Sequence, residues 1–261
     1  MPYNYKAIEK KWRENIETQC AKKAIKGSVL EKYTEIRQMH ESRRKHPVEF
    51  SQDLYWDYGT DAVQMYEMFA EPDDGDQYWD DGGLDGIYRF LTRFWRMAEA
   101  HIEAEKNTND SAEAVILCGE MIREIEKRLT RRSPSTAISV LMEYTRKLSR
   151  IKMTDDTLQK AICLLAPFAP YLAQELWERC ENAGSVMDAL WPKVSAEEIA
   201  QMDVEIPVQV NGVVRGKISV TASDSEELVW TRAEEILQKY CADQKRKKEI
   251  YVPGRILSVQ I

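Results

Sequence analysis

Apolar side chains recur at helical spacing near the start of the chain. The first run is Ile8, Trp12 and Ile16, and the second extends from Val29 to about Met39. Ser28 and Glu31 open the second run in the S-x-x-E order of a capping box, in which two side chains satisfy backbone N–H groups at a helix start. We therefore predict two helices in this region, broken near Gly27.

Helical spacing continues from residue 52 to residue 179 and predicts a bundle. Its strongest part is a wide apolar stripe that faces away from three arginines. The stripe is Ile87, Phe90, Leu91, Phe94, Trp95 and Ala98, and the arginines are Arg89, Arg93 and Arg96. Further helices are expected to begin near Asp110, after Pro134 and near Thr154, the last of them breaking at Pro167 and Pro170. A loop rich in Gly and Asp is predicted from residue 71 to residue 86.

The pattern changes to strict alternation after Trp191-Pro192. Apolar residues occupy every second position from Val204 to Val210 and again after Val213, on either side of Asn211-Gly212, which is a strong hairpin signal. A helix with an acidic first turn follows from Ser223 to about Tyr240, and residues 250–252 and 256–261 supply further strand. The ββαβ order predicts a small α+β domain, so the fold class is mainly α with an α+β end.

Composition sets the broad class of protein. Charged residues make up 31% of the chain, and no apolar run approaches the roughly 20 residues that cross a bilayer. The first residues do not form a charged and then apolar leader. We therefore expect a soluble, cytoplasmic protein with no membrane partner.

Catalytic and metal-binding motifs are absent from the sequence. The five cysteines form no C-x-x-C pair, the three histidines have no zinc-ligand spacing, and the Asp-rich stretch lacks the spacing of a calcium-binding loop. The chain also contains neither a phosphate-binding glycine loop nor a G-x-S-x-G elbow. No metal, no cofactor and no catalytic residue is predicted from these patterns.

Basic residues form local groups although the net charge is −7. An acidic total disfavours a polycation that coats nucleic acid, but a local basic face can coexist with it. One group lies at a helix end, where it could simply complement the helix dipole. The other belongs to the tail from Val204, whose net charge is only +1, and a short basic run is commonly solvated surface.

Six ordered segments resemble leucyl-tRNA synthetases. Tyr58-Gly59-Thr60-Asp61 with Met65 to Phe69 is similar to the family's YGADTLRLYEMF, and Gly86 to Leu91 with Arg93, Trp95 and Arg96 continues it after Trp79-Asp80-Asp81-Gly82. Ser135 to Glu143 resembles NTAISALME, and Leu164 to Glu178 resembles LLSPFAPHIAEELWE. In the tail, Val208 to Arg215 and Ile250 to Arg255 are similar to the family's C-terminal domain. The hairpin and the YVPGR segment together indicate the leucine enzymes among the class Ia relatives.

The sequence also departs from the family pattern, in the segments that carry catalysis. Tyr3 to Trp12 resembles the first helix of a full synthetase, but the sequence contains no H-x-G-H, and the nucleotide-binding and editing domains are missing between that helix and Tyr58. This pattern favours internal deletion over a split enzyme. His40 to Lys45 reads HESRRK where the family has KMSKSK. We interpret Ser42, Arg43, Arg44 and Lys45 as a degenerate remnant of the ATP loop.

The resemblance implies three regions and a function. The regions are residual N-terminal helices with the degenerate loop (1–51), a helical anticodon-binding-like bundle (52–192) and a C-terminal domain of the type that reaches the tRNA elbow (203–261). The expected function is noncatalytic tRNA binding by shape and phosphate contacts. The expected contacts are Arg128, Arg131, Arg132, Arg215, Lys217, Lys245, Arg246, Lys247, Lys248 and Arg255.

Two other hypotheses stay open at this point. The chain could be a protein-interaction module that lost the RNA and docks on a full-length synthetase or another partner through its N-terminal helices. A third hypothesis, an active leucine–tRNA ligase component, is expected to fail because the catalytic domain is absent.

Overall fold

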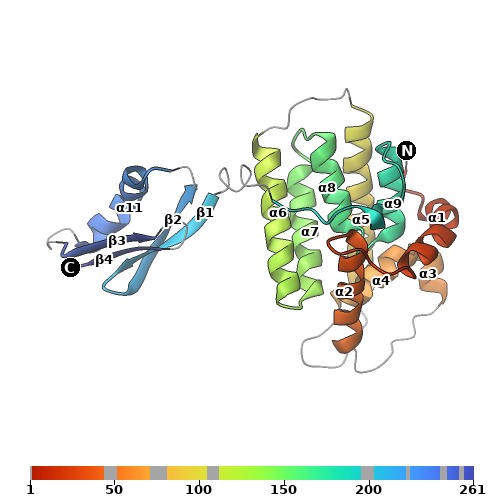
Figure 1. Ribbon diagram of the computed structural model, residues 1–261, viewed down its shortest axis with the longest axis horizontal. Helices are drawn as coiled ribbons and strands as arrows, with labels where there is room; N and C mark the ends of the chain where they lie inside the picture. The colour runs from red at the N-terminus through yellow and green to blue at the C-terminus, as the bar shows by residue number, and fades with distance from the viewer. Residues whose placement is uncertain are drawn as a thin grey trace. The chain divides into compact units, whose positions relative to one another are not determined.

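A computed structural model describes residues 2–43, 52–70, 81–104, 112–194, 203–221, 224–241, 246–252 and 256–261. The chain divides into two units, Met1–Lys193 and Val194–Ile261, each with its own internal contacts. The first unit is helical and the second is a small sheet with a helix (Figure 1). The predicted class, mainly α with an α+β end, is therefore confirmed.

The described helices of the first unit follow the apolar stripes of the sequence. They are α1 (Tyr5–Cys20), α2 (Val29–Arg43), α3 (Gln52–Tyr58), α4 (Thr60–Phe69), α5 (Asp81–Ile102), α6 (Ala112–Thr130), α7 (Pro134–Leu148), α8 (Asp155–Leu165), α9 (Pro170–Arg179) and the short 3₁₀ helix η1 (Val186–Asp188). The predicted break near Gly27 and the helix starts at Pro134 and Thr154 are confirmed. All six residues of the predicted α5 stripe are buried.

The capping box at the start of α2 forms with one difference. Glu31 N donates to Ser28 Oγ over 3.2 Å, as the S-x-x-E order predicts. The Glu31 carboxylate reaches one residue further back, where it accepts from Gly27 N over 2.6 Å. Gly27 adopts a φ of 81°, a left-handed conformation that glycine takes without strain, in the turn that joins α1 to α2.

The predicted loop from 71 to 86 is wrong at its C-terminal end, because α5 already begins at Asp81. Leu84 is buried one turn before Ile87 and extends the apolar stripe. Gly83 permits close packing of α5 against α4, since a Cβ there would lie 2.6 Å from the ring of Tyr66 in α4. Residues 71–80 lie outside the described part of the chain.

Carboxylates tie α1 to the rest of the first unit. Glu9 of α1 accepts from the backbone N–H and the hydroxyl of Thr60, the first residue of α4. Asp61 of α4 accepts from Tyr171 N (3.2 Å) and Leu172 N (2.7 Å) in the first turn of α9. Both carboxyl groups thus accept from N–H groups at helix starts, which have no partner within their own helix.

A third carboxylate closes this circuit from α9 back to α1. Glu175 accepts from Trp12 Nε1 over 2.8 Å and from Lys11 Nζ over 2.9 Å. Arg179 Nε donates to the same carboxylate over 3.0 Å. These bonds lower the pKa of Glu175 despite its burial, which alone would raise it.

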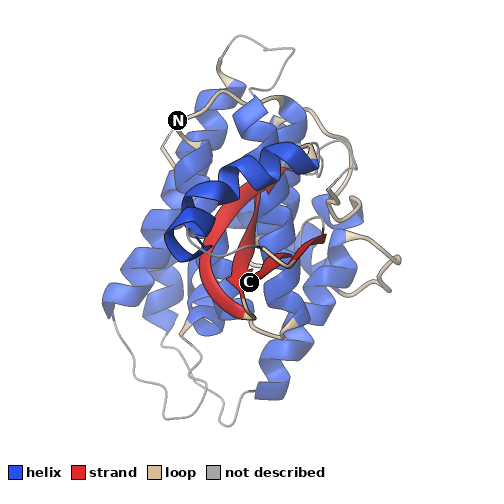
Figure 2. Ribbon diagram, turned by 90° about the vertical axis from the view of Figure 1, so that its left-hand side faces the viewer, coloured by secondary structure: helices blue, strands red, loops and turns tan. Residues whose placement is uncertain are grey.

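The second unit is a four-stranded sheet covered on one face by a helix (Figure 2). Its elements are β1 (Asp203–Val210), β2 (Val213–Thr221), α11 (Glu226–Cys241), β3 (Lys248–Val252) and β4 (Ile256–Gln260), with sheet order β2-β1-β4-β3. Strands β1 and β4 are parallel, while the other two pairs are antiparallel. The two strand segments predicted at residues 250–252 and 256–261 are β3 and β4, so the described order is ββαββ rather than ββαβ.

The β1–β2 hairpin has the two-residue turn that Asn-Gly predicts. Asn211 and Gly212 have φ values of 51° and 79°, and positive φ at both positions matches the twist of the strands. A bulge shifts the register, with Val208 opposite Gly216 but Gln209 opposite Val214, which leaves Arg215 as the additional residue of β2. Gly216 permits close packing of α11, because a Cβ there would lie 2.6 Å from Ile236.

A glycine substitution tests whether the contact between α1 and α4 is tightly packed. Gly59 precedes α4 with a φ of 89°, and a Cβ there would lie 2.6 Å from Tyr5 Cδ2 and 2.8 Å from Glu9 Oε1. Gly184 has a similar φ of 77° but nothing within 4 Å of its Cβ position. We expect Gly184→Ala to lower the free energy of unfolding by about 1 kcal/mol and Gly59→Ala by at least about twice as much. Equal losses in urea denaturation would contradict the packing argument.

Asp61 gives the stability a dependence on pH. Complete burial raises the pKa of Asp61 to about 8, against the opposing effect of its bonds from Leu172 and Tyr171. Between about pH 4 and pH 8 the folded chain therefore holds a proton that the unfolded chain has released, so stability falls as pH rises. From pH 5 to pH 8 we expect the unfolding free energy to drop by more than about 1 kcal/mol.

Asp61→Asn is the matching variant, because its amide oxygen accepts a hydrogen bond without titrating. We expect its unfolding free energy to change less over this pH range than that of the natural chain. Asp61→Ala should be destabilised at both pH values by about 1–3 kcal/mol, since it leaves N–H groups of α9 unpaired. Parallel pH slopes for Asp61→Asn and the natural chain would show that another group is responsible.

Candidate nucleic-acid interface

The turn between α6 and α7 carries the first group of predicted contact residues. α6 ends in a Schellman motif, in which Ser133 N donates to Arg128 O (3.0 Å) and Arg132 N donates to Leu129 O (2.8 Å). Arg132 occupies the left-handed position of this motif with a φ of 57°, where glycine is preferred. The motif thus places an arginine side chain at the turn at a cost of about 1 kcal/mol.

The cations of this turn differ in how far they are already paired. Lys127 and Arg128 each lie 3.4 Å from a carboxylate oxygen of Glu124. Arg132 Nη2 donates to the neutral hydroxyl of Ser42 over 3.2 Å. Arg131 is exposed and forms no ion pair with the described residues. Arg131 and Arg132 are therefore the cations here best placed to meet a phosphate.

The start of α7 adds polar groups beside these arginines. Pro134 stands in the first turn of the helix, and Ser133 precedes it without capping a backbone N–H group by its side chain. Instead, Thr136 Oγ1 donates to Ser133 Oγ over 2.9 Å. The start of α7 thus lies next to Arg131 and Arg132, but the end of α6 lies there too, so the dipoles of the two helices oppose each other at this turn and the arginines supply its positive charge.

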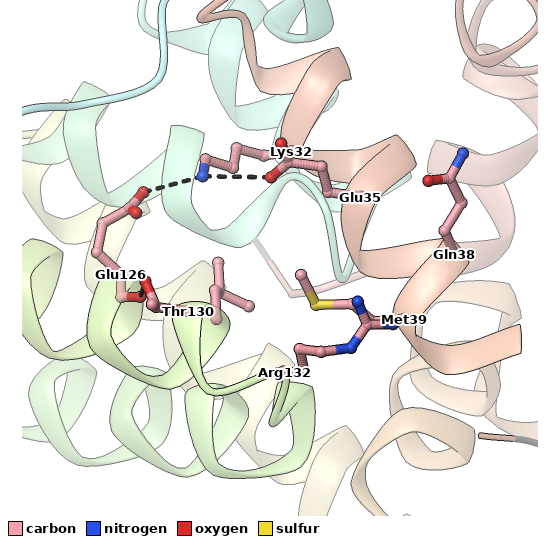
Figure 3. Close-up of a pocket in the computed structure, with 8 residues that line it drawn as sticks. Lys32, Glu35, Gln38, Met39, Glu126, Thr130 and Arg132 are labelled. Atoms are coloured by element: carbon pink, nitrogen blue, oxygen red, sulfur yellow. Dashed lines mark hydrogen bonds and ion pairs between the residues drawn. The ribbon is translucent and has the colours of Figure 1, made fainter. Parts of the chain in front are cut away.

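A cleft lies between α2 and the α6–α7 turn (Figure 3). Its volume is about 480 Å³, and it is lined by Lys32, Glu35, Gln38, Met39, Glu126, Leu129, Thr130 and Arg132. Ser42 lies beside it, at the end of α2, and its hydroxyl donates to Met39 O over 2.8 Å. Ser42, predicted as part of a degenerate ATP loop, is therefore in contact with Arg132, a predicted tRNA contact. The side chain of Arg43, and all of Arg44 and Lys45, lie outside the described residues.

In the second unit, Arg215 and Lys217 lie on β2. The guanidinium of Arg215, at the bulge, lies over the ring of Tyr240 in α11 at 5.0 Å from its centroid. Lys217 stands between Gly216 and Ile218, which face α11, so it belongs to the opposite face of the sheet. The hairpin therefore presents its two cations in different directions.

The basic run before β3 is only partly available. Arg246 Nη2 lies within hydrogen-bond distance of both carboxylate oxygens of Glu234 (2.8 and 2.9 Å), and Nη1 donates to Glu249 Oε1 over 3.2 Å. The bonds to Glu234, followed by those to Glu249, raise the pKa of Arg246. Lys247 and Lys248 are exposed, whereas Lys245 and Arg255 lie outside the described residues. Among the described members of the run, Lys247 and Lys248 are better placed to meet a phosphate than Arg246.

Three arginines on α5 were interpreted from sequence only as a solvated face. Arg89, Arg93 and Arg96 are exposed, and none forms an ion pair within the described part of the chain. Arg89 Nε donates to Asp85 O over 3.2 Å. Their i, i+4, i+7 spacing places them on one side of the helix, a signal that the sequence contained. They form a second exposed cationic surface on the first unit.

Two further kinds of site are absent from the described ranges. No three residues of the types His, Cys, Asp and Glu gather there in a way that could hold a metal ion. No described helix is both long and apolar enough to cross a membrane.

Comparison with known proteins places these surfaces in a family context. A family model described as the anticodon-binding domain of tRNA ligase matches residues 113–230. The leucine–tRNA ligase of Alcanivorax borkumensis is 30% identical over 227 residues, which are 80% of this chain and 28% of that protein. The chain is related to the leucine–tRNA ligases. The enzyme of Pectobacterium carotovorum is 32% identical over 225 residues, covering 78% of this chain and 26% of the relative.

A solved structure supports the same relationship at the level of the fold. The leucyl-tRNA synthetase of Agrobacterium radiobacter K84, crystallised in a ternary complex with tRNA and LeuAMS, matches with a TM-score of 0.68 at 22% identity. The match covers 83% of this chain and 31% of that one. This homologue of leucine–tRNA ligases thus spans less than a third of the length of each of these three relatives. The anticodon-binding match includes both the α6–α7 turn and the β1–β2 hairpin.

Two substitutions at Arg132 separate backbone strain from side-chain contacts. Arg132→Ala removes the bond to Ser42 but keeps a side chain at a left-handed φ, whereas Arg132→Gly removes both the bond and the strain. We expect the glycine variant to be more stable than the alanine variant by about 1 kcal/mol in urea denaturation. If alanine is equally stable, the turn has no strain for glycine to relieve.

Proposed function

We propose that this chain binds tRNA through phosphate contacts centred on the α6–α7 turn and that it does not aminoacylate tRNA by itself. The supporting observation is the coincidence of two independent features. The family model for anticodon-binding domains covers the turn, and the turn presents Arg131 and Arg132 beside the start of α7 without a described carboxylate partner for either. Phosphate contact needs such converging cations rather than a positive total charge.

The second unit would supply phosphate contacts of its own in the proposal. Lys217, Lys247 and Lys248 would contribute from the second unit, with Arg215 where it can leave the Tyr240 ring. Recognition would be by backbone shape, as is usual for double-stranded RNA, whose major groove side chains cannot read. The tRNA species is left open by such contacts, because phosphates carry no sequence information.

The noncatalytic part of the proposal rests on the sequence. The chain has no H-x-G-H, and HESRRK stands at the position of the family's second ATP-binding motif. Ser42, the described serine of that segment, bonds to Met39 O and accepts from Arg132. Its hydroxyl is thus engaged in structure at the edge of the RNA-binding turn. Leucine-dependent ATP–pyrophosphate exchange is expected to stay at background.

A protein-docking role through the N-terminal helices is the other outcome of the tests below. Lys11, Trp12 and Glu9 of α1 are engaged with α9 and α4 inside the first unit. Lys32 and Ser42 of α2 likewise contact α6 and the α6–α7 turn. These contacts use the N-terminal helices as part of the fold, which disfavours them as a free docking element.

Binding of total tRNA across a salt series tests the proposed function. We expect micromolar affinity at low salt that falls steeply as salt rises, because counterions are released on binding. Arg131→Ala should weaken binding and reduce the slope of log K against log salt by about 1. Arg123→Ala is the matched control, since Arg123 is an exposed arginine on α6 two turns before Arg131. Absence of tRNA binding at low salt would refute the proposal and favour the protein-docking role.

A further inference from the structure

The cleft between α2 and α6 has an acidic end. Lys32 Nζ lies 3.3 Å from Glu35 Oε2 and 3.4 Å from Glu126 Oε1, as the dashed lines of Figure 3 show. The indole N–H of Trp191 also donates to Glu126 Oε1. Two carboxylates thus share one lysine, and their remaining oxygens, Glu35 Oε1 and Glu126 Oε2, have no described partner. This end of the cleft can accept hydrogen bonds.

The opposite end is basic. Arg132 and Met39 face each other there (Figure 3). Nη2 of the Arg132 guanidinium donates to the hydroxyl of Ser42, and the other N–H groups of the guanidinium face no described carboxylate. Glu35 and Met39 are four residues apart on α2, which corresponds to about 6 Å along a helix. The cleft therefore has a hydrogen-bond-accepting end and a cationic end that lie about one helical turn apart along α2.

Its middle section combines apolar and polar side chains. Met39 and Leu129 supply apolar surface from opposite helices, and Gln38 and Thr130 supply an amide and a hydroxyl. Leu129 is buried and fixed in the core, whereas Met is adaptable and polarizable. A flat ring with hydrogen-bonding edges suits this section better than a purely aliphatic or a purely ionic ligand does.

We propose that the cleft receives one unpaired nucleotide of a bound RNA. This inference rests on the proposed function, because Arg132 belongs to the same turn. The phosphate lies on Arg132, the base lies between Met39 and Leu129, and the base edge points toward Glu35 and Glu126. The order of charges sets this direction, since the reverse would bring the phosphate against two carboxylates. An acidic peptide would meet the same repulsion.

The proposal includes a base preference. Carboxylate oxygens accept from exocyclic amino groups, which cytosine, adenine and guanine present on their edges, whereas uracil offers only its ring N3–H between two carbonyl oxygens that the carboxylates repel. Unpaired nucleotides are the usual targets of base-specific RNA recognition, because their edges are free. We therefore expect cytidine to bind more tightly than uridine in this cleft.

Short unstructured RNA oligonucleotides test the preference on the full chain. We expect a cytidine homopolymer of about eight nucleotides to bind about tenfold more tightly than the matching uridine homopolymer, measured by fluorescence anisotropy at constant salt. Glu35→Gln should lower this ratio while leaving uridine binding little changed, because a neutral amide oxygen accepts a hydrogen bond more weakly than a carboxylate does. Glu35 is 46% exposed and its ion pair is made within α2, so the variant should fold. Glu41→Gln, an exposed residue of α2 outside the cleft lining, should keep the full ratio.

Binding of tRNA measured alongside separates this inference from the proposed function. Equal affinity for the two oligonucleotides, or a ratio that Glu35→Gln leaves intact, would overturn the cleft assignment while tRNA binding by Arg131 could still stand. Loss of the ratio in Glu41→Gln as well would also overturn it, because the preference would then not arise in the cleft. Failure to bind either oligonucleotides or tRNA would refute both proposals.

Discussion

Buried carboxylates at helix starts are the interaction on which the first unit depends. Asp61 is completely buried, a location that is costly for a carboxylate unless its oxygens accept hydrogen bonds. The start of a helix supplies such donors, because its first N–H groups have no partner within the helix. Glu9 joins α1 to α4, Asp61 joins α4 to α9, and Glu175 joins α9 back to α1. No helix of this circuit can move away without leaving a buried polar group unpaired.

This circuit makes α1 part of the bundle although the sequence places it far from α9. Its partners are spread over more than 160 positions, from Lys11 to Glu175. α2 is held in turn against α6 by Lys32 and Glu126 and against the α6–α7 turn by Ser42 and Arg132. The N-terminal segment therefore determines how the turn is presented.

Sequence patterns predicted the elements well where local chemistry decides them. Helical stripes located α5 to α9, Pro134 marked a helix start, and Asn211-Gly212 predicted the hairpin turn. The start of α5 was missed because Gly82 and Gly83 resemble loop residues, although Gly83 is there to admit the Tyr66 ring. The bulge at Arg215 was also missed, since it depends on the pairing of β2 with β1.

The candidate site was predictable only as a set of residue types. Clustered arginines at a helix end are visible in sequence, but which of them has a carboxylate partner depends on contacts such as Arg246 with Glu234. The contact between Ser42 and Arg132 joins residues 90 positions apart, and no local spacing signals it. For the same reason Asp61 appeared only as a member of a family motif, while its role at the start of α9 required the fold.

The acidic total charge and a basic binding surface are compatible because charges act over short distances. At physiological salt the screening length is about 8 Å, so a phosphate at the α6–α7 turn responds to the charges of that turn and little to distant carboxylates. Many acidic residues are also paired locally, as Glu175 is with Lys11 and Asp224 is with Arg232. Among the described residues Arg131 lacks such a partner, and Arg132 has only a hydroxyl. The distribution of pairing, rather than the net charge of −7, therefore decides where this protein can hold an anion.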